Sequence, residues 1–408
     1  MQNVIKNNRY EFIDLLKAIA IFSVVIYHFS NMTPNLLKTQ DVFTYFNYFL
    51  KAILSASVSI FFFVNGALIL NKDLNLKKHA FKLITIIILT VVWGIITVLL
   101  LMPIKNEYMS LFEFGKTLWT WKLGWINHLW FLQTLVIIYM FFPLIKTAYD
   151  NNINNLYFFL VIVFVLTFGN IFLSNCVNIG ELVIHKNNLK GNFNFFNTFN
   201  AFKGIYGYSI VYFILGGLFF KYKEKFYEKK WVKLAIATIV IAMLVMTTYG
   251  LLISKGNGEI YDTVWNGLDT IPTLFMVIAI FILSLRYKGK AKISKLIRVV
   301  GKNSLGIYFV HIMYGSLFLE YFKKTPFSQS LITNLLFGIT ITLISLLTVL
   351  AIKKIPVVKN WLLFKRDLVL YPKHHGKLLK NITAVFLTWN FIRRSNRYSR
   401  FYNSINNM

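Results

Sequence analysis

The sequence predicts an all-α integral membrane protein, built as a bundle of about ten transmembrane helices. Three observations lead to this fold class. Hydrophobic residues make up 57% of the 408 residues and charged residues only 14%, which is far from the composition of soluble proteins. The apolar residues gather in runs of about 20, the length that crosses a hydrocarbon core as a helix. These runs are continuous, whereas the strands of a membrane barrel alternate in polarity.

Ten runs are candidates for these helices, in order along the chain. We expect helices at residues 11–30, 46–70, 80–102, 128–148, 156–175, 205–221, 231–253, 268–286, 301–320 and 331–352. The second run is long enough to be kinked or partly interfacial, and the sixth is short and rich in glycine. Residues 1–352 are therefore expected to form one membrane domain, and residues 353–408 a basic cytoplasmic juxtamembrane tail.

Lysine and arginine are distributed unevenly among the connections between the runs. The connections after the even-numbered runs are densely basic, for example KYKEKFYEKK at 221–230 and RYKGKAKISKLIR at 286–298. The other connections hold isolated lysines. Because short basic connections remain in the cytoplasm, we expect both termini to face the cytoplasm, in a multi-pass protein of the cytoplasmic membrane.

The net formal charge of +29 has two readings. Basic residues attract nucleic acids, but here they gather in the cytoplasmic connections and the tail, where they orient helices and contact anionic lipid. No nucleic-acid-binding motif accompanies them, so the lipid bilayer is an expected partner and nucleic acid is not. No metal-ligand spacing, glycine-rich phosphate loop or G-x-S-x-G motif occurs. Catalysis would therefore depend on histidine with polar support.

The first run, DLLKAIAIFSVVIYHFS at 14–30, carries ionisable side chains that cost roughly 2.5–3.5 kcal/mol at membrane depth. Lys17 and His28 are eleven residues apart, which places them about 16 Å apart on one helix face. Asp14 lies one turn before Lys17, within reach of an ion pair. The alternatives are that Lys17 extends to the headgroups and that His28 is merely interfacial.

The ninth run repeats this pattern in GKNSLGIYFVHIMYG at 301–315. Ser304, Tyr308 and His311 follow the i, i+4, i+7 spacing of one helix face. Hydrogen bonding between helices is the alternative role for these three side chains.

The fourth run begins NHLWFLQTL. His128 and Trp130 lie at the predicted outer boundary, where an aromatic belt is expected in any case, and Gln133 lies one turn deeper. Upstream, the predicted outer connection contains Trp119, Trp121 and Trp125. Flat aromatic faces beside amide and imidazole groups suit a sugar ring, and interfacial anchoring is the alternative.

Four segments resemble signatures of the acyltransferase-3 family of membrane O-acyltransferases, in the family's order. RYEFIDLLKAIAIFSVVIYH at 9–28 resembles its opening, with Lys17 where the family has arginine. SVSIFFFVNGALI at 57–69, HLWFLQTLVIIYMFFPLI at 128–145 and GKNSLGIYFVHIMYG resemble its second-, fourth- and ninth-helix signatures. Asn65 stands where serine is more usual. The HLWFL form resembles the subgroup that modifies surface polysaccharides and lacks a fused hydrolase-like domain.

The resemblance implies transfer of an acyl group, most simply acetyl, from cytoplasmic acyl-CoA to a sugar hydroxyl of a cell-envelope or exported polysaccharide. No permanently bound cofactor and no metal are implied. His28 would act as a base or as a transient acyl carrier. The acceptor would be a carbohydrate or lipid-linked glycan, with glycan-synthesis machinery as a partner. The candidates are His28 and His311 for catalysis, Asp14, Lys17, Ser304 and Tyr308 for the donor, and His128, Trp130, Gln133 and Asn65 for the acceptor.

Two other functions fit a bundle with polar groups at membrane depth. One is an exporter of polysaccharide chains, because such groups also line permeation paths. No internal repeat is evident in the sequence, which argues against a transporter built from duplicated halves. The other is a non-catalytic subunit of a glycan synthase complex.

Overall fold

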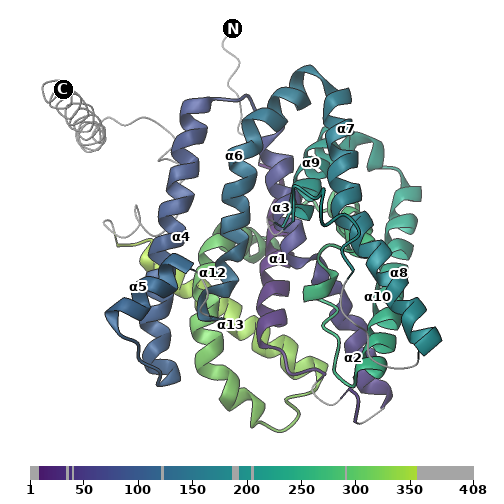
Figure 1. Ribbon diagram of the computed structural model, residues 1–408. Helices are drawn as coiled ribbons and strands as arrows, with labels where there is room; N and C mark the ends of the chain where they lie inside the picture. The colour runs from purple at the N-terminus through teal and green to yellow at the C-terminus, as the bar shows by residue number, and fades with distance from the viewer. Residues whose placement is uncertain are drawn as a thin grey trace, which may run out of the picture. The chain divides into compact units, whose positions relative to one another are not determined.

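The structure is a computed structural model that describes residues 9–33, 36–38, 41–120, 124–185, 193–203, 206–289 and 292–355. In these ranges every regular element is a helix (Figure 1), so the predicted all-α class is confirmed. The described residues all belong to one compact unit, Met1–Ile355. The part of the predicted basic tail that follows Ile355 lies outside the described residues. Trp121 and the side chain of Trp119 also lie outside them.

Eight segments of the described chain are long and apolar enough to cross a membrane, which makes this a multi-pass membrane protein. Five of them are single helices: α1 (Glu11–Phe29), α4 (Leu76–Lys105), α10 (Lys229–Asn257), α12 (Ile293–Lys323) and α13 (Leu331–Ile352). Val42–Ile69 consists of α2 (Val42–Lys51), a 3₁₀ turn and α3 (Ala56–Ile69), and Gly124–Asn151 of the 3₁₀ turn Gly124–Leu129 and α6 (Trp130–Asn151). Ile153–Ile184 consists of α7 (Ile153–Phe164), a π-helical turn and α8 (Asn170–His185), of which His185 lies just beyond the segment. A further short helix, α5 (Leu111–Thr120), follows α4.

The other two predicted runs form shorter helices, α9 (Tyr208–Lys221) and α11 (Ile271–Ser284), of 14 residues each. At 1.5 Å per residue such a helix is about 21 Å long, less than the roughly 30 Å of a hydrocarbon core. Most of their side chains are buried. The expectation of about ten spanning helices thus becomes eight long helical segments and two short buried helices.

Glycines let α9 pack directly on α3. A Cβ atom at Gly66 would overlap the backbone oxygen of Phe213, and one at Gly216 would overlap that of Phe63. The glycine content that marks the sixth run as unusual in the sequence therefore serves a close backbone crossing, as small residues do at other membrane helix interfaces.

α1 and α12 run beside each other along much of their length. A Cβ atom at Gly301 would overlap the backbone of Asp14, and one at Gly315 would overlap the ring of Phe29. Near contact at both ends of α1 keeps the two helices in fixed register. This register brings the last turn of α1 beside the middle of α12.

Basic connections surround the start of α1. Arg298 pairs with Glu11 at 2.5 Å, and Lys223 Nζ lies 5.8 Å from the centre of the ring of Tyr10, the residue before α1. Arg286 donates to the backbone oxygen of Tyr227 at 3.0 Å. We call this end of the bundle the basic end, and the end where α1 terminates at Phe29 the histidine end.

Candidate active site

Three imidazoles from distant parts of the sequence meet at the histidine end. His28 comes from the last turn of α1, His128 from the 3₁₀ turn before α6, and His311 from α12. The ring centroid of His311 lies 5.6 Å from that of His28 and 6.1 Å from that of His128. We call these three residues the histidine cluster.

Tyr308 holds the cluster together. Its hydroxyl donates to the backbone oxygen of His128, and its ring centroid lies 5.8 Å from those of His128 and of His311. Tyr308 was predicted to contact the donor. The structure places it among the histidines, where it fastens the turn before α6 to α12.

The three imidazoles differ in accessibility and in hydrogen bonding. His28 is exposed, whereas His128 is 5% exposed and His311 is fully buried. Nδ1 of His311 lies 2.6 Å from the backbone oxygen of Tyr308. A carbonyl oxygen only accepts, so Nδ1 of the neutral ring carries the proton and Nε2 the lone pair. Among the described residues this Nε2 has no hydrogen-bond partner, which leaves a buried lone pair inside the cluster.

A carboxylate stands beside His28 that the sequence did not reveal. Asp262, in the connection between α10 and α11, accepts a hydrogen bond from the Tyr27 hydroxyl at 2.7 Å. Its other oxygen accepts from the backbone N–H groups of Val264 at 3.0 Å and Trp265 at 3.2 Å. Its charge also acts on the ring of His28. The only sequence signal for this contact was a tyrosine adjacent to His28.

The predicted donor residues lie toward the basic end. Asp14 is buried, and Arg9 binds both of its carboxylate oxygens, at 2.6 and 2.7 Å. The partner predicted for Asp14 was Lys17, which is half-buried on the next turn. Arg9 was not predicted to contribute, although its planar guanidinium suits such a bidentate contact. Ser304, also predicted for the donor, is buried about two turns from His311 along α12.

The predicted acceptor residues divide into two groups. Trp130 follows His128 closely and packs against Tyr206 and Trp265, with ring centroids 4.7 and 5.6 Å away. Gln133 is half-buried one turn further along α6. Asn65 instead accepts from the hydroxyl of Tyr139 at 3.2 Å. Tyr139 lies about 13 Å beyond Trp130 along α6, so Asn65 lies apart from the histidine cluster.

No group of three or more histidine, cysteine or acidic side chains suited to a metal ion is found in the part of the chain that the structure describes. The arrangement offers acid–base chemistry. An accessible imidazole with a nearby carboxylate and a second imidazole can take a proton from a hydroxyl and return it to a leaving group.

Comparison with known proteins adds one finding. A family model described as an acyltransferase domain matches residues 10–353, a range that contains the histidine cluster, Asp262 and every predicted site residue. No match was found among curated proteins or among solved structures.

Proposed function

This chain belongs to the acyltransferase-3 family, and from that premise we propose that it transfers an acyl group, most simply acetyl, from acyl-CoA to a sugar hydroxyl of a cell-envelope or exported polysaccharide. Membership of the family makes the protein a membrane acyltransferase that uses an acyl donor. The observation that carries the proposed chemistry is the histidine cluster, with one accessible imidazole beside the carboxylate of Asp262.

In the proposed reaction His28 acts as a general base. Its unprotonated ring nitrogen takes the proton of the sugar hydroxyl, while the hydroxyl oxygen attacks the thioester carbonyl. The tetrahedral intermediate then collapses, the C–S bond breaks, and the CoA sulfur leaves with the proton from the imidazolium. The products are the sugar ester and free CoA, and the histidine returns to its starting state.

Asp262 and His311 support this assignment in different ways. The negative charge of Asp262 favours the imidazolium that forms transiently on His28, which is the role of the carboxylate in a catalytic triad. This arrangement favours base catalysis over an acyl-histidine. Within the described chain, the Nε2 lone pair of His311 has no hydrogen-bond partner, and it can accept a hydrogen bond within the cluster. We therefore assign His311 a positioning role beside His28.

The donor is proposed to enter from the basic end. Lys17, Asp14 with its partner Arg9, and Ser304 lie on that side of the cluster, and cationic groups there suit the phosphates of CoA. Lys17 and His28 are about 16 Å apart along α1, a separation that an extended pantetheine arm spans. The thioester would then reach His28 while the nucleotide stays at the basic end.

Mass spectrometry of the surface polysaccharide tests the proposal. Glycan is purified from cells with the wild-type protein, with a deletion, and with the variants His28→Ala and His79→Ala. His79 lies in the first turns of α4, where its Nε2 lies 2.7 Å from the backbone oxygen of Tyr139, and serves as the control histidine. A discrete ester mass should disappear in the deletion and in His28→Ala and persist in His79→Ala.

Two results would contradict the proposal. An ester that persists in His28→Ala removes His28 from the reaction. Glycan that is missing from the surface in the deletion, but normal in His28→Ala, favours an exporter or a non-catalytic subunit. Membrane levels of each variant are measured by immunoblotting, so that loss of the protein is not taken for loss of activity.

A further inference from the structure

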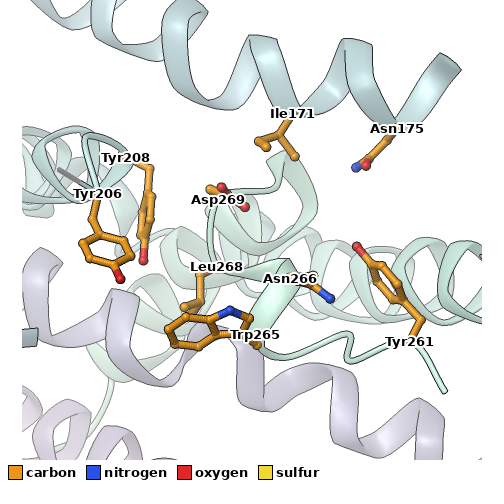
Figure 2. Close-up of a pocket in the computed structure, with 9 residues that line it drawn as sticks. All are labelled: Ile171, Asn175, Tyr206, Tyr208, Tyr261, Trp265, Asn266, Leu268 and Asp269. Carbon is orange, nitrogen blue, oxygen red and sulfur yellow. The ribbon is translucent and has the colours of Figure 1, made fainter. Parts of the chain in front are cut away.

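A pocket opens at the histidine end beside the connection between α10 and α11. Its volume is about 140 Å³, many times the roughly 10–15 Å³ that one water molecule needs. Figure 2 shows residues from α8 on one side of the pocket and residues of the connection opposite them. The lining residues are Ile171, Asn175, Tyr206, Tyr208, Tyr261, Trp265, Asn266, Leu268 and Asp269. We call this space the Trp265 pocket.

The lining combines flat aromatic rings with polar groups. Tyr206 and Trp265 are 37% and 43% exposed, so their rings remain available to a ligand. Asn175 and Asn266 contribute amides, and the carboxylate of Asp269 lies among the aromatic rings (Figure 2). Aromatic faces pack against the C–H faces of a sugar, while amides and carboxylates bond its hydroxyls.

The charge of the pocket disfavours anionic ligands. Among the described residues, no lysine or arginine lines it, so phosphate groups find no cation there. Asp269 is half-buried; desolvation raises its pKa to about 6, and a carboxylate in such a position is stabilised by hydroxyl donors. The polar groups disfavour an acyl chain. A hydroxyl-rich ligand without anionic groups therefore fits the pocket.

Two sets of contacts link the Trp265 pocket to the histidine cluster. The ring of Trp130, two residues after His128, packs against both Tyr206 and Trp265. Asp262 follows the lining residue Tyr261 and accepts from the backbone N–H of Trp265, while its second oxygen accepts from Tyr27, the neighbour of His28. One short connection thus forms a wall of the pocket and also holds the carboxylate beside His28.

We propose that the Trp265 pocket binds one sugar ring of the acceptor glycan, held between aromatic faces and the Asp269 carboxylate, with a neighbouring hydroxyl directed to His28. This inference rests on the proposed acyl transfer. It moves the acceptor site from the predicted residues His128, Trp130, Gln133 and Asn65 to the surface formed by α8, the start of α9 and the connection before α11. Of the predicted acceptor residues, Trp130 packs against the lining residues Tyr206 and Trp265.

Saturation-transfer NMR tests binding separately from catalysis. Full-length protein in nanodiscs is mixed with the methyl glycosides of glucose, galactose, N-acetylglucosamine and rhamnose, one at a time. At least one glycoside should receive saturation from the wild type. Trp265→Ala should lose this signal, or weaken binding by about tenfold, and Asp269→Asn should weaken it as well. The matched controls are Trp231→Ala, at a ring that packs against Phe226, and Asp73→Asn, at an exposed aspartate between α3 and α4. Neither residue lines the pocket, so both variants should bind as the wild type does.

The proposal is overturned if no glycoside binds the wild type, or if Trp265→Ala binds as the wild type does. Release of CoA from acetyl-CoA is measured in parallel, with cell-derived glycan as acceptor. Glycoside binding that depends on Trp265, without any CoA release, would support sugar binding in the Trp265 pocket and contradict acyl transfer. CoA release with binding that does not depend on Trp265 would contradict the pocket alone.

Discussion

The Asp262 carboxylate is held by three donors, the hydroxyl of Tyr27 and the backbone N–H groups of Val264 and Trp265. With both oxygens engaged, the carboxylate keeps its position relative to His28. A fixed charge stabilises a developing imidazolium without reorganising during the reaction. Asp262 therefore acts through His28, as a positioning residue.

Asp262→Asn should lower kcat by about 100-fold while leaving the KM for acetyl-CoA unchanged, since it removes the charge but keeps the shape of the side chain. Asp262→Glu should restore part of kcat. Steady-state kinetics of CoA release by the protein in nanodiscs measures both constants. A variant with wild-type kcat, or with an altered donor KM alone, would remove the proposed role.

A second prediction concerns Asp269 and pH. Its pKa is raised from the ordinary 3.8 to about 6 by burial, outside the spanning helices. A raised carboxyl pKa means that the contribution of Asp269 to stability is fully present below about pH 3.8 and is lost as the pH rises through 6. Asp269→Asn cannot ionise, so its stability relative to the wild type should increase between pH 4 and pH 8, by up to about 3 kcal/mol.

Thermal unfolding at a series of pH values checks this expectation. The control is Asp73→Asn, an exposed aspartate, for which the difference from the wild type should not change between pH 4 and pH 8. A difference for Asp269→Asn that is independent of pH would show that the carboxyl is not buried in the folded protein.

The members of the histidine cluster were identified in the sequence from spacing and resemblance, His28 and His311 as catalytic candidates and His128 as an acceptor candidate. That the three rings meet was not predicted. Asp262 and Arg9 were missed for a physical reason. Each reaches its partner from a connection or an end of the chain, where no periodic pattern determines which side chains meet.

At the scale of elements, the crossing of α3 and α9 leaves no space for a side chain at Gly66. Gly66→Ala should therefore destabilise the protein by about 3 kcal/mol or more, because its methyl group would force the two backbones apart. Gly180→Ala is the control, since a Cβ atom at Gly180 in α8 meets nothing within 4 Å. Alanine there should be neutral or stabilise by up to about 1 kcal/mol.

Fluorescence-detected size exclusion after heating measures both variants. Equal unfolding temperatures for Gly66→Ala and the wild type would mean that α3 and α9 do not touch as described. A hydropathy window finds apolar runs, but it does not determine how long the helix in each run is. Ten runs were predicted to form spanning helices, and eight segments of the described chain are helices long and apolar enough to span, while α9 and α11 are shorter.

At the scale of the whole molecule, composition and run length were enough to predict an all-α membrane bundle, because a backbone inside lipid must satisfy its own hydrogen bonds. The described parts of the basic connections 221–230 and 286–298 lie beside the start of α1, as the contacts of Lys223 with Tyr10 and of Arg298 with Glu11 show. Their grouping agrees with a cytoplasmic basic end, and that orientation stays a prediction from the charge distribution.

The connection between α10 and α11 has a consequence for the timing of the reaction. It contributes Trp265 to the pocket wall and Asp262 to the neighbourhood of His28, so a sugar that settles against Trp265 also steadies the charge that His28 needs. Without a sugar, the three donors alone hold this charge, and no acceptor hydroxyl lies beside His28. We therefore expect little hydrolysis of the acyl-CoA thioester in the absence of the sugar, and full activity only when both substrates are present.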